Sequence, residues 1–553
     1  MSSDTRILGI EGTAWAASAA VYDSATDDVT IESDAYEPES GGIHPREAAE
    51  HMHEAIPRVV ETALEHARDT HDGPATEPPV DAIAFSQGPG LGPCLRIVGT
   101  AARALSQTLE VPLVGVNHMV AHLEIGRHTS GFDSPVCLNA SGANAHLLAY
   151  RNGRYRVLGE TMDTGVGNAI DKFTRHVGWS HPGGPKVEAA AEDGEYVELP
   201  YVVKGMDFSF SGIMSAAKQR YDDGTPVADI CFSLQENIFG MLTEVAERAL
   251  SLTGSDELVL GGGVGQNARL REMLAAMCDQ RGASFHAPAA RFLGDNAGMI
   301  AVLGAKMYDA GDTLELAESR VNPNYRPDQV AVTWRGKSER SEDLEIGRET
   351  ETVQGAEALV DLEPDAGRVT KRREPKRYRH PELDDRLRRE RTTLEARLTS
   401  LARRAGVPTP VLTDVDPIDA RLEFEYVGEA DLRDGLSVER VRDVGRHLAR
   451  LHRAGFVHGD PTTRNVRVGR TERPSRDGDR ERTFLIDFGL GYHTDHVEDY
   501  AMDLHVFDQS LVGTATDPTP LREAVREGYR EIGDHRVLER LEDVEGRGRY
   551  VTD

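Results

Sequence analysis

The first part of the chain alternates short apolar runs with longer amphipathic stretches. The apolar runs have the length and composition of buried strands. Four of them are Ile7–Ile10, Ala82–Phe85, Leu113–Val116 and Leu258–Leu260. Between them, Arg46–His66 and Cys231–Leu252 have the length and periodicity of helices. This alternation continues to about Tyr325 and predicts an α/β fold.

The pattern changes at residues 322–327, which read Asn-Pro-Asn-Tyr-Arg-Pro. Residues 335–348 are charged and contain few apolar side chains, as expected of an exposed linker. Beyond them lie a strand-like Glu357–Leu362, a helix-like Asp384–Ala405 and short strands around His458 and Asp487. We therefore expect a first domain over 1–326, a linker over 327–349 and a second domain over 350–553.

Length and composition agree with a globular chain of more than one domain. Its 553 residues exceed what one hydrophobic core usually organises, and 39% are hydrophobic. The formal net charge is -30, and few of the 63 basic residues are lysines. Dense carboxylates stay solvated in concentrated salt, so we expect a salt-loving host. The charge by itself argues against nucleic-acid binding, and it also fits a plain solvated acidic face.

The cysteines and the hydropathy pattern point to the cytoplasm. Cys94, Cys137, Cys231 and Cys278 are far apart and form no CxxC pair, so neither a disulfide framework nor a thiolate zinc site is indicated. No apolar run is long enough to span a bilayer, and no apolar signal segment follows Met1. We expect a cytoplasmic protein with no membrane partner.

His118 and His122 are separated by one helical turn, which lets both imidazoles reach one metal ion. Such pairs also occur in ordinary packing, so the spacing alone does not establish a site. The run lacks the glutamate of an HExxH motif. Without that general base, a zinc protease loses its main sequence support.

Glycine-rich turns are spread over both halves of the α/β region, and their backbone amides could bind phosphates. They are found at residues 9–12, 88–92, 141–142, 182–185 and 261–267. The last one follows a strand, but no acidic residue lies at the distance of about 20 residues expected of a dinucleotide-binding fold. Several such turns in two halves favour the actin-like ATPase fold, in which two lobes close on a nucleotide.

Six motifs in order resemble the catalytic subunit of the KEOPS complex over residues 5–326. They are residues 86–96, His118 with His122, Asp171-Lys172, Pro182-Gly-Gly-Pro185, Asp207-Phe-Ser-Phe-Ser-Gly212 and Gly294-Asp-Asn296. The resemblance implies an actin-like fold. It also implies transfer of a threonylcarbamoyl group from threonylcarbamoyl-adenylate to N6 of the adenosine 3′-adjacent to the anticodon, in tRNAs that read codons beginning with adenine.

The same resemblance implies site residues by position. One iron or zinc ion would be bound by His118, His122 and Asp295. The residues implied to contact the adenylate are Asn139, Ala140, Ser141, Gly142, Ala143, Asp171, Gly184, Glu188 and Asn267. Taken singly, Asp171 could pair with Lys172, and Gly184 and Asn267 could be turn residues; their joint occurrence favours the adenylate site.

One departure from the family concerns the metal. Archaeal members usually read Tyr-Val-Ser-Gly-Gly where this chain reads Asn139-Ala-Ser-Gly-Ala143, so a tyrosine ligand is absent. An asparagine oxygen or a water could substitute for it. No Ser-His-Asp or Cys-His constellation requires a covalent intermediate, so direct transfer is the simpler hypothesis.

The second domain carries the catalytic residues of protein kinases. Asp460 and Asn465 have the five-residue spacing of a catalytic loop, and Asp487-Phe-Gly489 follows an apolar run. Asp460 would orient or deprotonate the acceptor, while Asn465 and Asp487 would hold magnesium. Upstream, Lys371 would bind ATP phosphates and pair with a carboxylate. We expect that carboxylate to be Glu395, on a helix.

Other kinase features are missing. Gly355-Ala-Glu-Ala358 stands where a GxGxxG loop for ATP would lie, and no Ala-Pro-Glu motif follows Asp487. We therefore expect ATP hydrolysis or phosphorylation of a dedicated partner. Residues 378–384, 391–397 and 458–460 resemble the small KEOPS kinase, over about 350–553. This resemblance implies ATP and Mg as ligands and other KEOPS subunits as partners.

Arginines gather near the start of the second domain, with Arg388 and Arg389 at the centre. They could contact the tRNA backbone, or they could pair with neighbouring acidic residues on a solvated helix. Two other functions compete with the leading one. A sugar-kinase-like phosphotransferase would share the actin-like fold but would not need the histidine pair, and a non-catalytic scaffold would not keep the kinase residues together.

Overall fold

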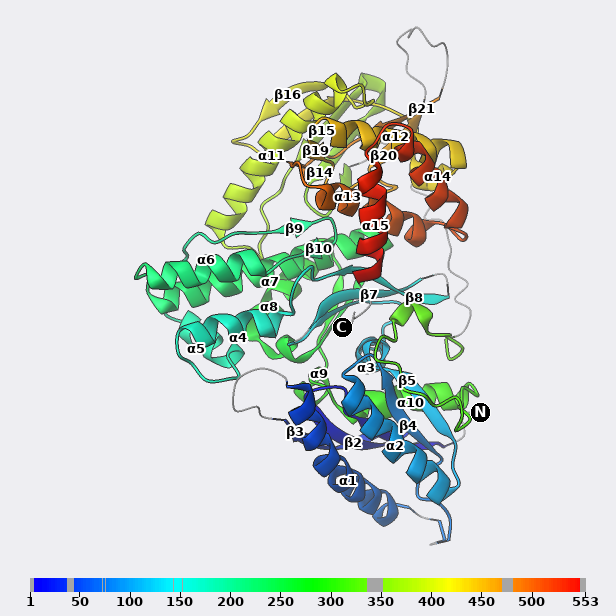
Figure 1. Cartoon of the computed structure of the whole chain (residues 1–553). Helices are drawn as coiled ribbons and strands as arrows, with labels where there is room; N and C mark the ends of the chain where they lie inside the picture. Colours follow the sequence, from blue (N-terminus) through cyan, green and yellow to red (C-terminus); the bar gives the residue numbers. More distant parts are fainter. Residues whose placement is uncertain are drawn as a thin grey trace. The chain divides into compact units, whose positions relative to one another are not determined.

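The computed structural model describes residues 4–36, 44–71, 73–74, 76–142, 144–151, 153–335, 352–469 and 481–547. The chain forms two compact units, coloured along the sequence in Figure 1. The first unit comprises Met1–Val202 and Phe208–Glu342, and the second comprises Val203–Asp207 and Asp343–Asp553. Among the described residues, no helix combines the length and the apolar character needed to cross a bilayer.

The first unit begins with a five-stranded sheet in the order β3-β2-β1-β4-β5. Its strands are β1 (Arg6–Glu11), β2 (Ala16–Asp23), β3 (Asp28–Ala35), β4 (Ala82–Gly88) and β5 (Leu113–Asn117). The hairpin strands β1, β2 and β3 are antiparallel, whereas β4 and β5 run parallel to β1.

Helices cover both faces of this sheet. They are α1 (Pro45–Asp69) and α2 (Gly92–Leu109) on one face, and α3 (His118–Ser130) and α10 (Ala297–Asp309) on the other. Successive residues of a strand point to opposite faces. Accordingly, Leu8 and Ile10 of β1 join the core under α1 and α2, and Ile7 joins the core under α3 and α10.

The second half of the first unit repeats this topology in the order β12-β11-β6-β7-β8. Its strands are β6 (Val136–Ala140), β7 (Ala145–Arg151), β8 (Arg154–Glu160), β11 (Glu257–Gly261) and β12 (Ser284–His286). Again three antiparallel strands are followed by two strands parallel to the first of them. Two such sheets with helices between their strands form the actin-like fold that the glycine turns predicted.

The remaining elements of this half are mostly helical. They are α4 (Val166–His176), α5 (Gly184–Ala191), α6 (Ser211–Asp222), α7 (Val227–Thr253), η1 (Gly263–Gln266), α8 (Ala268–Arg281), α9 (Ala290–Leu293) and η2 (Pro327–Gln329). The segment Val203–Asp207, which is part of the second unit, carries β9 (Val203–Lys204) and the first residue of β10 (Asp207–Phe208). Residues 327–335, which were expected to be linker, pack within the first unit through Val330 and Trp334. The rest of the expected linker lies outside the described residues.

The second unit opens with an antiparallel sheet in the order β13-β14-β15-β17-β16. Its elements are β13 (Thr352–Gln354), β14 (Leu359–Glu363), η3 (Pro364–Ala366), β15 (Arg368–Arg372), α11 (Pro381–Arg404), β16 (Leu412–Asp416) and β17 (Arg421–Glu425). Ala396 of α11 packs against Leu422 and Phe424 of the sheet.

The other half of the second unit is mainly helical. Its elements are β18 (Ala430–Asp431), η4 (Leu432–Gly435), α12 (Val438–Arg453), β19 (Phe456–Val457), β20 (Val466–Gly469), β21 (Arg482–Leu485), β22 (Tyr492–His493), α13 (Val497–Thr514), α14 (Thr519–Arg530) and α15 (His535–Arg547). A sheet with one long helix, followed by a helical half with its own core, is a reduced bilobal protein-kinase-like fold.

The long helices follow from the apolar spacing of the sequence. The predicted helix Arg46–His66 lies within α1, where Met52, Ile56, Val59 and Ala63 are buried at helical intervals. The predicted helices at 231–252 and 384–405 correspond to α7 and α11. Pattern alone was sufficient for these elements.

A buried carboxylate joins several elements of the first unit. Glu124 of α3 is paired with Lys306 of α10 at 3.0 Å and with Arg127 at 3.0 Å, and it accepts a hydrogen bond from Tyr155 of β8 at 2.6 Å. The guanidinium of Arg335 lies 3.5 Å away. Although burial opposes its charge, these cations lower the pKa of Glu124 to about 2.

Replacing Glu124 by Gln should lower the free energy of unfolding of the first unit by about 3 kcal/mol near neutral pH, because three neighbouring cations lose their counter-charge. Since pairing lowers the folded-state pKa, the stabilisation is complete above the ordinary value of 4.5 and disappears as the pH falls toward about 2. Denaturant unfolding of wild type and variant across that range should therefore give curves that converge in acid. The exposed Glu61→Gln change on α1 is the control, and a difference independent of pH would contradict the assignment.

Candidate metal, nucleotide and kinase sites

Two asparagine caps place the predicted metal ligands. Asn117 ends β5, and its side chain accepts hydrogen bonds from two amides of the next turn at 3.0 and 3.1 Å, so that α3 begins at His118. Asn296 caps α10 in the same way at 3.1 Å. Asp295 therefore lies immediately before a helix N-terminus. Both helices pack on the same face of the first sheet, which brings their starts together.

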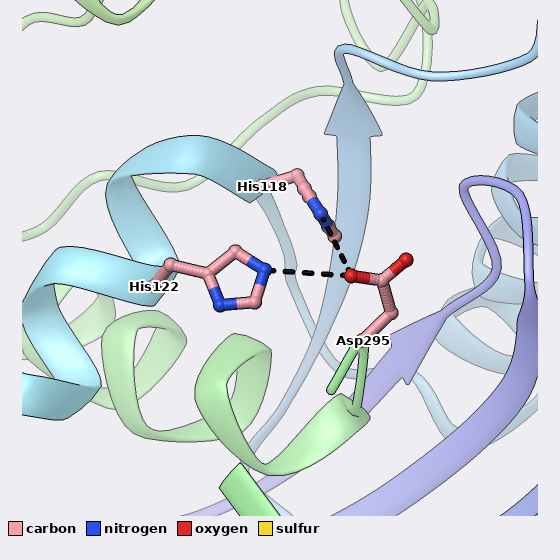
Figure 2. A group of neighbouring side chains, drawn as sticks. All are labelled: His118, His122 and Asp295. Atoms are coloured by element: carbon pink, nitrogen blue, oxygen red, sulfur yellow. Dashed lines mark ion pairs between the residues drawn. The ribbon is translucent and has the colours of Figure 1, made fainter. Parts of the chain in front are cut away.

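His118, His122 and Asp295 converge, as the motifs predicted. Figure 2 shows both imidazoles directed from one helix toward the Asp295 carboxylate. Each Nε2 lies 3.4 Å from Asp295 Oδ1, and the two rings are 4.9 Å apart and nearly perpendicular. The three ligand atoms lie within 4.8 Å of one another. Two imidazoles and one carboxylate are a donor set that suits iron(II) or zinc.

Glu11 adds a second carboxylate to this cluster. It is fully buried at the end of β1, and its Oε2 accepts a hydrogen bond from His118 Nδ1 at 3.1 Å. The amide of Thr13 donates to its Oε1 at 2.8 Å, and the Ser86 hydroxyl donates to its Oε2. A carboxylate on the far nitrogen of a ligating histidine fixes the tautomer of that ring. Glu11 was not predicted from the sequence, although a carboxylate that ends an apolar strand was a usable signal.

The carboxylates control the protonation of His118. Burial disfavours the charged ring, but Glu11 and Asp295 together raise the pKa of His118 to about 10. The ring therefore carries a proton at neutral pH in the absence of a metal ion, and metal binding has to displace it. Burial lowers the pKa of His122, which keeps that ring in the neutral form that binds metals.

Several buried polar atoms around the cluster have no hydrogen-bond partner among the described residues. They are both ring nitrogens of His122, Oδ1 of Asn139 and Nδ1 of His146. Burial, with His122 and His118 nearby, lowers the pKa of His146 to about 3. Buried unpaired polar atoms of this kind are typical of places that receive an ion or an ordered water. The residues present therefore fit a metal ion.

The predicted adenylate loop follows β6. Asn139 and Ala140 end that strand, and the loop packs on the start of α4. Gly167 donates its amide to Ser141 O at 3.3 Å, and Asn168 donates to Gly142 O at 2.9 Å. Ala143 lies outside the described residues. The loop is thereby fixed to the helix that carries Asp171.

Asp171 organises a second glycine turn. Its Oδ1 accepts the amide of Gly183 at 2.8 Å, and its Oδ2 lies 3.1 Å from His181 Nδ1. The His181 ring stacks on Trp15 from the β1–β2 loop, with centroids 5.4 Å apart and planes at 9°. Gly184 then begins α5. This Trp15–His181 pair was not predicted, because no local pattern in the sequence indicates it.

Glu188 and Asn267 meet at the start of α8. Glu188 accepts the amide of Ala268 at 2.8 Å, while Asn267 caps the helix and donates to Gln235 at 2.9 Å. Hydrogen bonds thus connect the loop after β6 to α4, which carries Asp171, and connect Asp171 to the turn at residues 183–184. Glu188 then connects α5 to α8. Contact of these residues with an adenylate stays a prediction.

The kinase residues of the second unit also converge. Lys371 Nζ lies 2.9 and 3.1 Å from the two carboxylate oxygens of Glu395, and 2.7 Å from Asp487. Burial opposes the charge of Lys371, but the two carboxylates raise its pKa. Asn465 donates to Asp460 Oδ2 at 3.1 Å. The structure thus joins Lys371, Glu395 and Asp487 in one group and Asp460 with Asn465 in another.

Two further features of this cluster were not foreseen. Arg373 is buried two residues beyond Lys371 and binds Glu395 at 2.5 Å, so one carboxylate serves two cations. A side chain at Gly489 would collide with this arginine. Gly355 lies in the turn between β13 and β14, where its amide donates to Ala358 O at 2.9 Å.

The arginine-rich segment is paired along α11. Arg388 lies 2.8 Å from Asp384, and Arg389 lies 3.0 Å from Asp385. These contacts favour the second of the two interpretations given above, in which the arginines neutralise acidic neighbours on a solvated helix.

Comparison with known proteins identifies the family. Residues 25–302 match the family of tRNA N6-adenosine threonylcarbamoyltransferases. The chain is 68% identical to a protein of Haloarcula marismortui described as a probable bifunctional tRNA threonylcarbamoyladenosine biosynthesis protein, over 99% of this chain and 100% of that one. Proteins of the same description from Halobacterium salinarum and Methanospirillum hungatei are 69% and 50% identical, each over 99% of both chains. The chain belongs to this bifunctional family.

Membership assigns tRNA threonylcarbamoyladenosine biosynthesis to the protein and transferase chemistry to its first unit. The family resemblance inferred from the motifs is confirmed, and the relatives include halophilic archaea. tRNA is therefore a substrate. The histidine and aspartate cluster is the place in this transferase unit where a metal ion fits.

Replacing His122 by Ala should reduce the metal bound by the purified full chain at least about tenfold, because one of three ligands is lost. In wild type, metal affinity should rise with pH toward about 10, since His118 must release its proton. Elemental analysis and metal titration at several pH values measure both effects. The control is His128→Ala on the same helix, whose ring pairs with Asp27. Equal metal content in the two variants would contradict the site.

Proposed function

We propose that the first unit transfers the threonylcarbamoyl group of threonylcarbamoyl-adenylate to N6 of the adenosine 3′-adjacent to the anticodon, in tRNAs reading codons that begin with adenine. The observation that carries this proposal is the convergence of His118, His122 and Asp295 in a unit where Asp171 accepts the amide of Gly183 in a glycine turn. A sugar-kinase-like phosphotransferase has no use for such a cluster.

Each group of residues has a role in the proposed reaction. Backbone amides of the 139–143 loop and of the turn at Gly184 bind the phosphate of the adenylate. Asp171, Glu188 and Asn267 bind the nucleoside by hydrogen bonds. His118, His122 and Asp295 hold iron or zinc, and Glu11 orients His118. When bound, such an ion acts as a Lewis acid toward carbonyl and phosphate oxygens.

The transfer itself needs no covalent enzyme intermediate. N6 of the acceptor adenosine attacks the carbonyl carbon of the mixed anhydride, and a carbon–nitrogen bond forms as the carbon–oxygen bond to phosphate breaks. AMP leaves with the electron pair, and N6 loses one proton overall. The protein residues contribute by holding the two substrates in reach of each other and by placing donors around the developing negative charge.

Full-length protein with its partner subunits in concentrated salt should form threonylcarbamoyladenosine from the adenylate and unmodified tRNA. Nucleoside mass spectrometry detects the product. The double variant His118→Ala/His122→Ala should lose at least about a hundredfold in rate, because the metal ligands are gone. His128→Ala is the matched control on the same helix. Product formed equally by the double variant would refute the role of the metal site.

We further propose that the second unit binds ATP and Mg and acts as an ATPase, or as a serine/threonine kinase for a dedicated partner, to support the transferase within a KEOPS complex. Lys371 binds the phosphates, Asn465 and Asp487 hold Mg, Asp460 faces the acceptor or water, and Gly355 belongs to the loop over the nucleotide. The formed Lys371–Glu395 pair supports this assignment.

The short segment after the magnesium loop supports a narrow substrate range. Between Gly489 and the start of α13 at Val497, the chain forms only the two-residue strand β22. A peptide-docking activation segment has little room there, so ATP hydrolysis or one fixed partner fits better than broad phosphorylation. A non-catalytic scaffold would have no need for the contacts of Lys371 with Asp487 and of Asn465 with Asp460.

Asp460→Asn should reduce release of phosphate from ATP at least about a hundredfold, because the group that orients the attacking oxygen is altered. Lys371→Met should do the same through lost phosphate binding. Radiolabelled ATP measures hydrolysis without partners and protein phosphorylation with them. The exposed Asp495→Asn change is the control. Undiminished turnover in both active-site variants would rule out catalysis by this unit.

A further inference from the structure

Helices α4 and α6 of the first unit lie side by side and run in the same direction. Asp163, three residues before α4, accepts hydrogen bonds from the amides of Phe210 and Ser211 at the start of α6, at 3.1 and 2.9 Å. At the other end, the His176 ring of α4 lies 2.8 Å from the carboxylate of Asp222 of α6. Because the starts and the ends of the two helices meet, residues at the same height on each helix are neighbours.

This arrangement brings two lysines together. Lys172 stands four residues before His176, and Lys218 stands four residues before Asp222. Residues four apart share a helix face, so each lysine lies one turn above the contact between His176 and Asp222. Arg175 is exposed on the same side of α4 as Lys172, which is also exposed. The two helices therefore present three cations on one surface.

These cations are not neutralised by carboxylates. Among the residues that the structure describes, none of Lys172, Arg175 and Lys218 forms an ion pair. Arg388 and Arg389 of α11, in contrast, are both paired with acidic neighbours. The whole chain has eight lysines and a net charge of -30. Cations gathered without counter-charges are therefore unusual in this protein, and a bound polyanion would relieve their mutual repulsion.

The two acidic side chains nearest to these cations in sequence already have other partners. Asp171 accepts the amide of Gly183, and Asp222 pairs with His176. The surface thus keeps a locally positive charge.

An exposed aromatic ring completes the surface. Tyr221 is 37% exposed and lies three residues beyond Lys218, on the same face of α6. Its ring meets the ring of His176 edge to face, with centroids 5.9 Å apart and planes at 76°. Cations beside an exposed aromatic ring are typical of surfaces that bind single-stranded nucleic acid, because cations attract phosphates while the ring stacks on an unpaired base.

The surface borders the predicted adenylate site. Asp171, which binds the glycine turn through the amide of Gly183, directly precedes Lys172 on α4. Successive helix residues point about 100° apart, so one side of α4 holds the glycine turn and the adjacent side carries the cations. A nucleic-acid loop that brings a base to the adenylate would therefore have its phosphates near these cations.

We propose that Lys172, Arg175 and Lys218 bind backbone phosphates of the tRNA and that Tyr221 stacks on an unpaired base of its anticodon loop. This inference rests on the proposed function, which puts the reacting adenosine beside the anticodon. The two kinds of contact respond differently to salt. Concentrated salt screens the attraction between cations and phosphates, whereas stacking does not depend on charge. Tyr221 therefore maintains binding where the cations contribute less.

Binding of fluorescently labelled, unmodified tRNA to the full-length protein with its partner subunits tests this surface, with anisotropy measured at several KCl concentrations. The double variant Lys172→Gln/Lys218→Gln should bind about tenfold more weakly at the lowest salt. The slope of log affinity against log salt should fall by about one for each lost lysine. Lys172→Arg/Lys218→Arg should retain both the affinity and the slope. Tyr221→Ala should bind about tenfold more weakly at every salt concentration with an unchanged slope, and Tyr221→Phe should bind as wild type does.

The matched control removes two cations elsewhere on the first unit. Arg68 of α1 and Arg154 of β8 are exposed, and Arg68→Gln/Arg154→Gln changes the net charge by the same amount as the lysine variant. This control should bind tRNA as wild type does. Circular dichroism of each variant first establishes that it is folded.

The outcomes separate this inference from the proposed function. If the lysine and tyrosine variants bind tRNA as wild type does while wild type forms threonylcarbamoyladenosine, the function stands and the surface is wrong. If the control loses as much affinity and slope as the lysine variant, overall charge explains the effect and the inference is overturned. If the variants lose affinity as expected but wild type forms no product, the surface is supported and the proposed function fails.

Discussion

The transferase site depends on two asparagine side chains that decide where two helices begin. Asn117 and Asn296 each satisfy amides that a helix N-terminus leaves unpaired, and each stands beside a ligand residue. A cap of this kind contributes only about 1 kcal/mol to stability. Its positional effect is larger, because a helix that started one residue later would turn His118 or Asp295 away from the cluster.

Buried carboxylates shared by several partners recur in both units. Glu124 is paired with three cations and a tyrosine. Glu11 is paired with a histidine, a hydroxyl and an amide, and Glu395 with Lys371 and Arg373. A buried charge lowers stability unless it is fully paired. Each set therefore acts as one unit, and removing any member reduces the free energy of unfolding. These sets fix helix positions against sheets in a protein whose overall charge is strongly negative.

The metal cluster lies where the two repeated halves of the first unit contribute different chemistry. Glu11 and the histidine pair come from the first half, whereas Asn139 and His146 come from the second sheet. Gly261 lets these groups approach, because its missing side chain leaves the space between His122 and Asn139 open. The two halves share one topology, and the different side chains that they carry lie together at one site.

The sequence by itself determined the features that depend on short spacings. Apolar periodicity gave the α/β alternation and the long helices, the i and i+4 spacing put His118 and His122 on one helix face, and the five-residue step placed Asp460 beside Asn465. Only the tertiary structure decided which distant residues complete these groups. Arg373 and the Asn139–His146 pair have no local signal, because their contacts exist only after strands and helices have packed together. The tertiary structure also pairs Arg388 with Asp384, whereas the sequence had left open both tRNA contact and pairing with acidic neighbours. The physical reason is that periodicity depends on residues close together in sequence, whereas long-range contacts depend on how strands and helices pack.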